Sequence, residues 1–392
     1  MNVRARTVGQ RWTLGALFAV AVIVFADMYL AQPILPVFSK EFSIGPATAG
    51  LAVSVVVLVI ALASLAIGPL SDRVGRKRIM VLGSTLLAVP TLLCALAPSF
   101  NWLLVFRALQ GLCIPGLTAV AVAYLGDILA PAVLGSAVGG WIAANVAGGL
   151  IGRVLSGVLT DLFGWRVVFG LFATVTLCGG LLLALLLPVD AQRESDGWLQ
   201  SYRGMFAHFL NRQLVGGFLI GGSLFFGFIG LFTYLPYYLT GAPFNVPSRL
   251  VSFAYVTYIA GVVASPIAGR LSARVPRRLL IGIGLVMAMI GASITLVPSV
   301  AVIIGSLLLV CAGMFAAQAV APAFVNVTAE RAKGGAGALY LLFYYLGGTL
   351  GGVLPGLAWQ SNGWVGVVVI CLSAFLVALL ANVLLCGKPT VR

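Results

Sequence analysis

Twelve long runs of apolar residues, separated by short polar segments, constrain what this 392-residue chain can fold into. Each run is close in length to the ~20 residues that an α-helix needs to cross the hydrocarbon core of a bilayer. Apolar residues make up 61% of the chain and charged residues 8%, whereas about 25% of an ordinary soluble domain is charged. This composition excludes a secreted disulfide scaffold, a disordered chain and a nucleic-acid-binding protein. The sequence predicts an all-α integral membrane protein whose twelve spans lie near residues 12–36, 47–69, 79–97, 102–125, 134–158, 165–187, 214–240, 250–269, 279–298, 301–324, 335–358 and 364–386.

A polar linker at 188–213 divides the predicted spans into two sets of six. We expect an N-terminal six-helix bundle at 1–187 and a C-terminal six-helix bundle at 214–392. The linker carries apolar and aromatic residues at helical spacing, which predicts a short helix lying on the membrane surface. These residues are Trp198, Leu199, Tyr202, Met205, Phe206 and Phe209.

The basic residues predict the orientation of the spans. Eighteen Lys and Arg residues lie on the side that holds both termini, and three, Lys40, Arg166 and Arg249, lie on the opposite side. Because cytoplasmic loops carry the excess of basic residues, we expect both termini in the cytoplasm. The protein is then a multi-pass protein of the plasma membrane, which in a bacterium is the inner membrane. The net charge of +14 follows mostly from this asymmetry and from contact with lipid.

The two halves of the sequence repeat each other. Residues 68–77, GPLSDRVGRK, align with residues 269–278, GRLSARVPRR, and residues 163–165 align with residues 362–364. Two parallel six-span repeats joined by a polar linker are typical of one transporter architecture.

Three segments carry a family resemblance. Residues 68–80, GPLSDRVGRKRIM, resemble the loop signature between spans 2 and 3 of the major facilitator superfamily, and residues 107–111, RALQG, resemble its span-4 motif. Residues 148–153, GGLIGR, resemble the span-5 motif of proton antiporters but have Gly149 in place of its proline and Arg153 in place of its last glycine. In this respect the chain is similar to the arabinose-efflux-permease-like branch of the twelve-span drug:proton antiporters. The resemblance implies two pseudo-symmetric six-helix bundles and transport by alternating access.

The loop signature implies a conformational latch. In the family, the aspartate at the position of Asp72 contacts the start of span 11, and the matching region here is Glu330–Lys333. Asp127, at the inner end of span 4, is placed to pair with Arg73 or Arg76. A basic anchor with no switching role is the alternative. The predicted gate consists of Gly68, Asp72, Arg73, Gly75, Arg76, Asp127, Glu330 and Arg331.

Three charged residues lie at membrane depth. Asp27, Arg107 and Arg153 fall in predicted spans 1, 4 and 5 and, at ~1.5 Å per residue, in the outer half of the membrane. The resemblance brings these spans together around a central cavity. A charge inside the membrane costs at least ~2.5 kcal/mol and is usually functional. Burial favours a neutral carboxyl group and a nearby arginine favours the ionised form, so we predict that Asp27 and Arg107 couple transport to protons. A purely structural Asp–Arg pair is the alternative.

Polar and aromatic side chains of the spans form the expected substrate cavity. Apolar walls with a few oriented polar groups suit a small organic molecule, although helix packing or the interfacial belt explains each tyrosine at least as well. The predicted cavity residues are Gln32, Gln110, Asn145, Arg153, Tyr234, Tyr237, Tyr255, Tyr258, Gln318, Tyr340 and Tyr344.

The sequence contains no phosphate-loop motif, catalytic triad, dinucleotide fingerprint or metal-binding cysteine spacing. We therefore expect a transporter and not an enzyme, with no cofactor and with the proton gradient as its energy source, acting as a monomer. The leading interpretation is export of small organic compounds, such as drugs or sugars, in exchange for protons. An organic-anion symporter or uniporter that uses Arg107 and Arg153 is the alternative. A receptor or scaffold is a third interpretation, although no signalling domain accompanies the spans.

Overall fold

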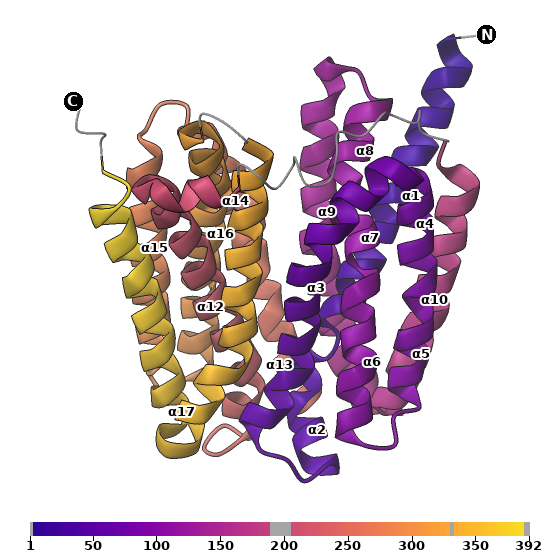
Figure 1. The fold of residues 1–392 in the computed structure, drawn as a ribbon. Coiled ribbons are helices and arrows are strands. Elements are labelled where there is room, and N and C mark those ends of the chain that lie inside the picture. The colour runs from indigo at the N-terminus through magenta and orange to yellow at the C-terminus, as the bar shows by residue number, and fades with distance from the viewer. Residues whose placement is uncertain (1–2, 189–204, 330–332, 388–392) are drawn as a thin grey trace. The chain divides into compact units, whose positions relative to one another are not determined.

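The computed structural model describes residues 3–188, 205–329 and 333–387. These residues form α-helices, short 3-10 helices and connecting turns, with no β-strand among them. Eleven helical segments of the described chain are long and apolar enough to cross a membrane. The last of them, α17 (Lys333–Leu384), contains Gly363 in a non-helical conformation (φ 54°, ψ −138°) that joins two helices across a kink. Figure 1 shows α17 running in one direction and then back, so this segment supplies two spans. The predicted all-α membrane architecture is confirmed.

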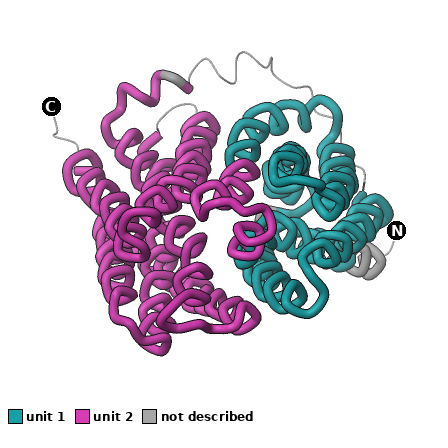
Figure 2. Tube along the Cα trace, turned by 90° about the horizontal axis from the view of Figure 1, so that it is seen from below, with its two compact units in different colours: residues 1–34, 58–195 teal, residues 35–57, 196–392 magenta. Residues whose placement is uncertain are grey.

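The chain divides into two compact units (Figure 2). Unit 1 comprises residues 1–34 and 58–195, and unit 2 comprises residues 35–57 and 196–392. This division follows spatial contacts, whereas the predicted bundles at 1–187 and 214–392 follow the order of the spans.

The predicted surface helix of the linker lies partly outside the described residues, which exclude Trp198, Leu199 and Tyr202. The described part of the linker forms a 3-10 helix, η2, at Phe206–Leu210.

Proline residues accompany helix breaks in two spans of unit 1. Proline lacks an N–H group and its ring clashes with the carbonyl four residues earlier. Pro90 accordingly follows a break in span 3 at Leu87, and Pro115 begins a new helix in span 4. The helices of unit 1 are α1 (Val3–Tyr29), η1 (Gln32–Ile34), the second part of α3 (Pro46–Val74), α4 (Arg76–Leu86), α5 (Ala88–Ala95), α6 (Phe100–Cys113), α7 (Pro115–Thr118), α8 (Ala121–Ile128), α9 (Pro131–Phe163) and α10 (Trp165–Leu186).

Two glycines bring α9 into close contact with α1. A Cβ atom on Gly148 would meet the backbone of Val22, and one on Gly152 would meet the backbone of Ala26. Small residues at this spacing allow membrane helices to approach closely. The approach places the C-terminal end of α1 beside α9, where the candidate site lies.

Unit 2 includes the segment 35–57 because this segment bonds to helices that come much later in the chain. Ser39 and Tyr237 share a hydrogen bond of 2.7 Å between their hydroxyl groups, and the Ser54 hydroxyl donates to the Thr349 carbonyl oxygen at 2.7 Å. The helices of unit 2 are α2 (Leu35–Glu41), the first part of α3, η2, α12 (Arg212–Thr240), α13 (Ser248–Val251), η3 (Ser252–Thr257), α14 (Tyr258–Leu271), α15 (Arg277–Ile294), α16 (Val300–Thr328) and α17 (Lys333–Leu384).

Candidate functional site

The carboxylate of Asp27 is fully buried in unit 1 and accepts hydrogen bonds from three neutral side chains. Thr91 on α5 donates to Oδ2 at 2.6 Å, and Thr176 on α10 donates to the same oxygen at 3.4 Å. Gln110 on α6 donates from Nε2 to Oδ1 at 2.9 Å. Four helices, α1 included, therefore meet at this carboxylate.

Arg107 is also fully buried, but its guanidinium group is directed to the end of α1. It donates to the carbonyl oxygen of Met28 at 2.8 Å, to that of Asp27 at 3.4 Å, and to Oε1 of Gln110 at 2.8 Å. Because α1 ends at Tyr29, these carbonyl groups belong to its last turn and have no partner within the helix. Arg107 supplies donors that the helix end lacks.

The side chains of Asp27 and Arg107 are joined indirectly, and both the proton-coupling and the structural interpretation of the two residues stay predictions. Among the ion pairs of the described residues, none joins Asp27 to an arginine. Gln110 lies between the two charges instead, since its amide nitrogen donates to Asp27 while its amide oxygen accepts from Arg107.

Arg153 belongs to a second polar network. Its Nε donates to Oε1 of Gln32 and its Nη1 to the Gly149 carbonyl oxygen, both at 2.6 Å, and the guanidinium group lies 3.8 Å above the Tyr29 ring centroid. The expected single cluster of three charges is therefore two networks. The physical reason is the end of α1, because Tyr29 and Gln32 meet α9 whereas Asp27 meets α5, α6 and α10.

The predicted site residues do not include Thr91, Thr176 or Tyr29. A usable signal existed for Thr91, which is the only hydroxyl-bearing residue between 86 and 98 in an otherwise apolar span. Thr176 has Thr174 as an equivalent neighbour in sequence, and Tyr29 resembles any aromatic residue of the interfacial belt. For these two residues only the packing of the helices reveals the partner.

The predicted gate begins where α3 ends. Gly75 has φ 104°, a conformation that favours glycine, and it separates Val74 at the end of α3 from Arg76 at the start of α4. The helix therefore continues beyond residue 69, where the span was predicted to end, and includes Asp72 in its last turn.

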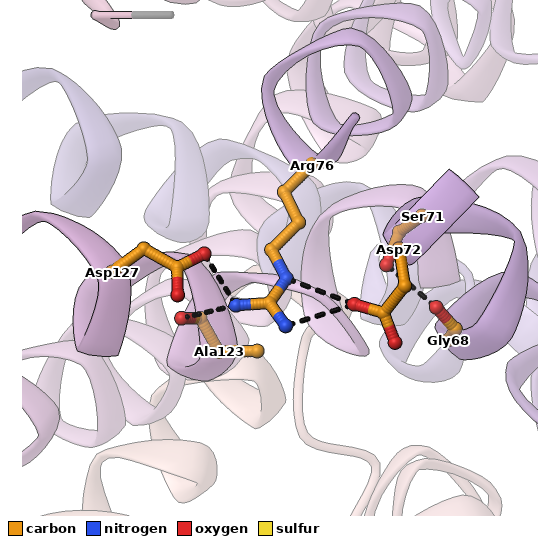
Figure 3. Close-up of polar contacts among 6 residues, drawn as sticks. All are labelled: Gly68, Ser71, Asp72, Arg76, Ala123 and Asp127. Carbon is orange, nitrogen blue, oxygen red and sulfur yellow. Dashed lines mark hydrogen bonds and ion pairs between the residues drawn. The ribbon is translucent and has the colours of Figure 1, made fainter. Parts of the chain in front are cut away.

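Arg76 joins two carboxylates of unit 1 (Figure 3). Its Nε and Nη2 donate to Oδ1 of Asp72 at 3.1 and 2.8 Å, and its Nη1 donates to Oδ2 of Asp127 and, at 2.8 Å, to the Ala123 carbonyl oxygen. Of the two arginines predicted to pair with Asp127, the structure selects Arg76. The side chain of Arg73 is exposed.

The remaining predicted gate residues have different positions. Gly68 accepts a hydrogen bond of 2.6 Å from the Ser71 hydroxyl through its carbonyl oxygen. Glu330 and Arg331 lie outside the described residues, so their contact with Asp72 remains a prediction.

Most of the predicted cavity tyrosines of unit 2 form hydrogen bonds, through their hydroxyl groups, to other residues of the same unit. The Tyr234 hydroxyl donates to the Gly352 carbonyl oxygen at 2.7 Å, and that of Tyr255 donates to the Phe232 carbonyl oxygen at 3.0 Å. Tyr237 has the hydrogen bond to Ser39 described above.

The structure brings three other predicted cavity residues together. The Tyr340 hydroxyl donates to Oε1 of Gln318 at 2.8 Å, and the Tyr340 ring stacks on that of Tyr344 at 6.3 Å. Tyr258 belongs instead to an aromatic cluster with Tyr255.

Asn145 stands apart from both networks of unit 1. Its amide lies against Trp141 on the preceding turn of α9, and the orientation that satisfies both groups donates to the Trp141 carbonyl oxygen at 3.2 Å and accepts from its indole N–H at 3.1 Å. A role of Asn145 in substrate binding stays a prediction.

Comparison with known proteins identifies the family. The model of the Major Facilitator Superfamily matches residues 17–260. An inner membrane transport protein, YnfM, of Escherichia coli (strain K12) is 35% identical over 95% of this chain and 88% of its own length. An uncharacterized MFS-type transporter, YybF, of Bacillus subtilis (strain 168) is 34% identical over 93% of this chain and 91% of its own length.

The fold also has solved counterparts. A bacterial homologue of the human lysosomal transporter Spinster superposes with a TM-score of 0.79 over 95% of both chains, at 19% sequence identity. The family match and the two relatives place the function of this chain among membrane transporters and not among enzymes. The chain belongs to the major facilitator superfamily.

Proposed function

We propose that this transporter is a proton-coupled antiporter that exports small organic compounds by alternating access, within the twelve-span drug:proton antiporter branch. One observation carries the proposal: the buried Asp27 carboxylate has hydrogen-bond partners that suit both its ionised and its protonated form.

Thr91 provides this adaptability. Its hydroxyl oxygen lies 2.6 Å from Oδ2 of Asp27 and 2.8 Å from the Leu87 carbonyl oxygen, and a hydroxyl has only one hydrogen to donate. When Asp27 is ionised, Thr91 donates to it. When Asp27 is protonated, the carboxyl group donates to Thr91 and the Thr91 hydrogen turns to Leu87. Neither state leaves a buried donor without an acceptor, so protonation avoids the penalty of ~1–3 kcal/mol for an unsatisfied group.

The contacts of Arg107 support the same conclusion. Three of its acceptors are the two backbone carbonyl groups and Gln110, and none of them changes its charge when Asp27 is protonated. A direct ion pair would lose its charge-assisted hydrogen bonds when the carboxylate is protonated, whereas the acceptors of Arg107 given above are neutral in both states. Bridging through Gln110 lets the carboxylate change its charge at lower cost.

The proposal includes a latch and an orientation. Asp72, Arg76 and Asp127 would hold the cytoplasmic ends of spans 2, 3 and 4, and the latch would act with the region that contains Glu330 and Arg331. Both termini would lie in the cytoplasm. The protein would act as a monomer driven by the proton gradient, without a cofactor.

Proton movement in proteoliposomes tests the proposal. The full chain is reconstituted with a pH-sensitive dye inside the vesicles, a pH gradient is imposed, and a panel of drugs, dyes and sugars is added. Asp27→Asn is compared with the wild type and with Asp161→Asn, the same substitution at an exposed carboxylate at the end of α9. We expect a solute-dependent proton signal from the wild type and Asp161→Asn and none from Asp27→Asn.

A second readout separates loss of coupling from loss of folding. Asn at position 27 can direct its oxygen to Gln110 and its NH₂ group to Thr91, which then donates to Leu87, so the variant keeps these two contacts and loses only the longer bond from Thr176. Exchange of labelled for unlabelled solute across the membrane should therefore continue in Asp27→Asn. Normal proton coupling in this variant would exclude Asp27 as the coupling residue.

An organic-anion symporter or uniporter is the second candidate. It is favoured by Arg153, which is 2% exposed and whose hydrogen-bond acceptors described above are neutral. Uptake of organic anions that Arg153→Gln abolishes, without any proton signal, would select this candidate over antiport.

A further inference from the structure

The C-terminal part of the chain has almost no carboxylates to balance its arginines. Residues 197–392 contain eleven Lys and Arg residues and a single acidic residue, Glu330. The sequence 269–278 alone carries four of these arginines. The ion pairs of Arg76 with Asp72 and Asp127 belong to unit 1. Among the described residues, no ion pair involves an arginine of 269–278.

The internal repeat shows which arginine has lost its partners. An offset of 201 residues carries Arg76 to Arg277, Asp72 to Ala273 and Asp127 to Thr328. Arg76 bonds to both of its carboxylates, whereas the corresponding positions around Arg277 are neutral. The repeat has kept the cation and replaced both anions.

A groove occupies the corresponding place in unit 2. Its volume is about 840 Å³, within the ~300–1,000 Å³ typical of ligand sites, and Arg277 and Thr328 both line it. Leu279, Ile283 and Val286 of α15 contribute exposed apolar side chains to its wall. Because α15 is a candidate membrane span, we expect this apolar wall to face hydrocarbon.

Two buried polar atoms of the groove lack a hydrogen-bond partner. They are Nε of Arg277, a donor, and Oδ1 of Asn382, an acceptor on a side chain that is only 3% exposed. The Nδ2 group of Asn382 donates to the Arg278 carbonyl oxygen at 3.0 Å, which fixes the direction of the amide. A buried atom of this kind costs ~1–3 kcal/mol unless something bonds to it.

The start of α15 adds positive potential at the same place. The helix begins at Arg277 after Pro276, and no side chain caps it. Its first N–H groups therefore carry the partial positive charge of the helix dipole, which favours a phosphate.

We propose that this groove binds an anionic phospholipid of the cytoplasmic leaflet whose headgroup carries a hydroxyl, as in phosphatidylglycerol. The phosphate accepts from Arg277 and from the first turn of α15. The headgroup hydroxyl donates to Oδ1 of Asn382, and an acyl chain lies along the apolar wall of α15. The lipid phosphate takes the place that Asp72 and Asp127 occupy beside Arg76.

Native mass spectrometry of the detergent-purified full chain tests this proposal. Phosphatidylglycerol and phosphatidylcholine with identical acyl chains are titrated separately. We expect the wild type to retain phosphatidylglycerol preferentially, and Arg277→Gln to weaken that retention roughly fivefold, the contribution of one basic side chain near an anionic lipid. Arg274→Gln is the matched control, since it removes the same charge from an exposed position outside the groove lining and should leave retention unchanged.

A second variant keeps the test decisive if Arg277→Gln fails to fold. Val286→Trp places a large apolar side chain in the groove without changing its charge and should also weaken retention of phosphatidylglycerol measurably. Equal retention of the two lipids, equal effects of Arg277→Gln and Arg274→Gln, or no effect of Val286→Trp would each overturn the proposal. Displacement of the lipid by millimolar inorganic phosphate would also overturn it, because a free anion would then be the ligand.

Discussion

The two carboxylates that flank Arg76 should differ in their contribution to stability. The side chains of Arg76 and Asp127 are each 15% exposed, whereas that of Asp72 is 43% exposed and lies four residues before Arg76. Solvent screens the Asp72 pair, and exposed i,i+4 pairs contribute only ~0.3–0.5 kcal/mol. The Asp127 pair is more desolvated and joins α4 to α8, so Coulomb attraction across it is stronger.

The magnitude follows from these geometries. Asp127→Asn should lower the free energy of unfolding by ~1–2 kcal/mol, as expected for a hydrogen bond to a charged group. Asp72→Asn should lower it by ~0.5 kcal/mol or less. If unit 1 unfolds like a domain of ~150–250 residues, 1 kcal/mol corresponds to a melting-temperature decrease of about 2–4 °C.

Double-mutant cycles measure the two interactions separately. Arg76→Gln is combined with Asp127→Asn and with Asp72→Asn, and thermal unfolding of the purified chain is followed by intrinsic fluorescence in one detergent at 0.05 and 0.5 M salt. The coupling energy with Asp127 should be about 1 kcal/mol. That with Asp72 should be a few tenths of a kcal/mol and should fall further at high salt.

Either of two results would contradict the ranking of the two ion pairs by burial. If the coupling energy with Asp72 equals or exceeds that with Asp127, burial does not rank the two pairs, and the bidentate approach of Arg76 to Oδ1 of Asp72 is the stronger interaction. A coupling with Asp127 near zero would have the same consequence.

Two further predictions concern the end of α1. Arg153→Lys keeps the charge but loses the planar stack on Tyr29 and at least one of the two hydrogen bonds. The free energy of unfolding should therefore fall by ~1–3 kcal/mol in the same thermal assay. A variant as stable as the wild type would show that charge alone matters. Gly152→Val places a side chain against the backbone of Ala26 and should lower the free energy of unfolding by ~1–3 kcal/mol. Gly170→Ala is the control, because nothing lies within 4 Å of the new Cβ, and it should be neutral or stabilising by up to ~1 kcal/mol. Equal effects of the two substitutions would contradict the close packing of α1 and α9.

The sequence predicted the membrane-spanning architecture well because hydropathy is a local property. A run of apolar residues specifies a span whatever its neighbours are, and spans must be helical because no water is present to satisfy their backbone groups. The loop signature at 68–80 gave the superfamily for a similar reason, since its residues are adjacent in the chain. Span boundaries were less accurate. The helix that contains Asp72 ends only at Gly75, where the backbone adopts a positive φ.

The sequence alone also placed Asp27, Arg107 and Arg153 inside the membrane, but only the tertiary structure decided what each of them contacts. Thr91 and Thr176 reach Asp27 from 64 and 149 residues away, and such contacts depend on how the helices pack and rotate. The end of α1 at Tyr29 then directs Arg107 to free carbonyl groups and leaves Gln110 between the two charges. Composition and spacing determine which residues enter the membrane, whereas helix packing determines which of their few polar groups can satisfy one another there.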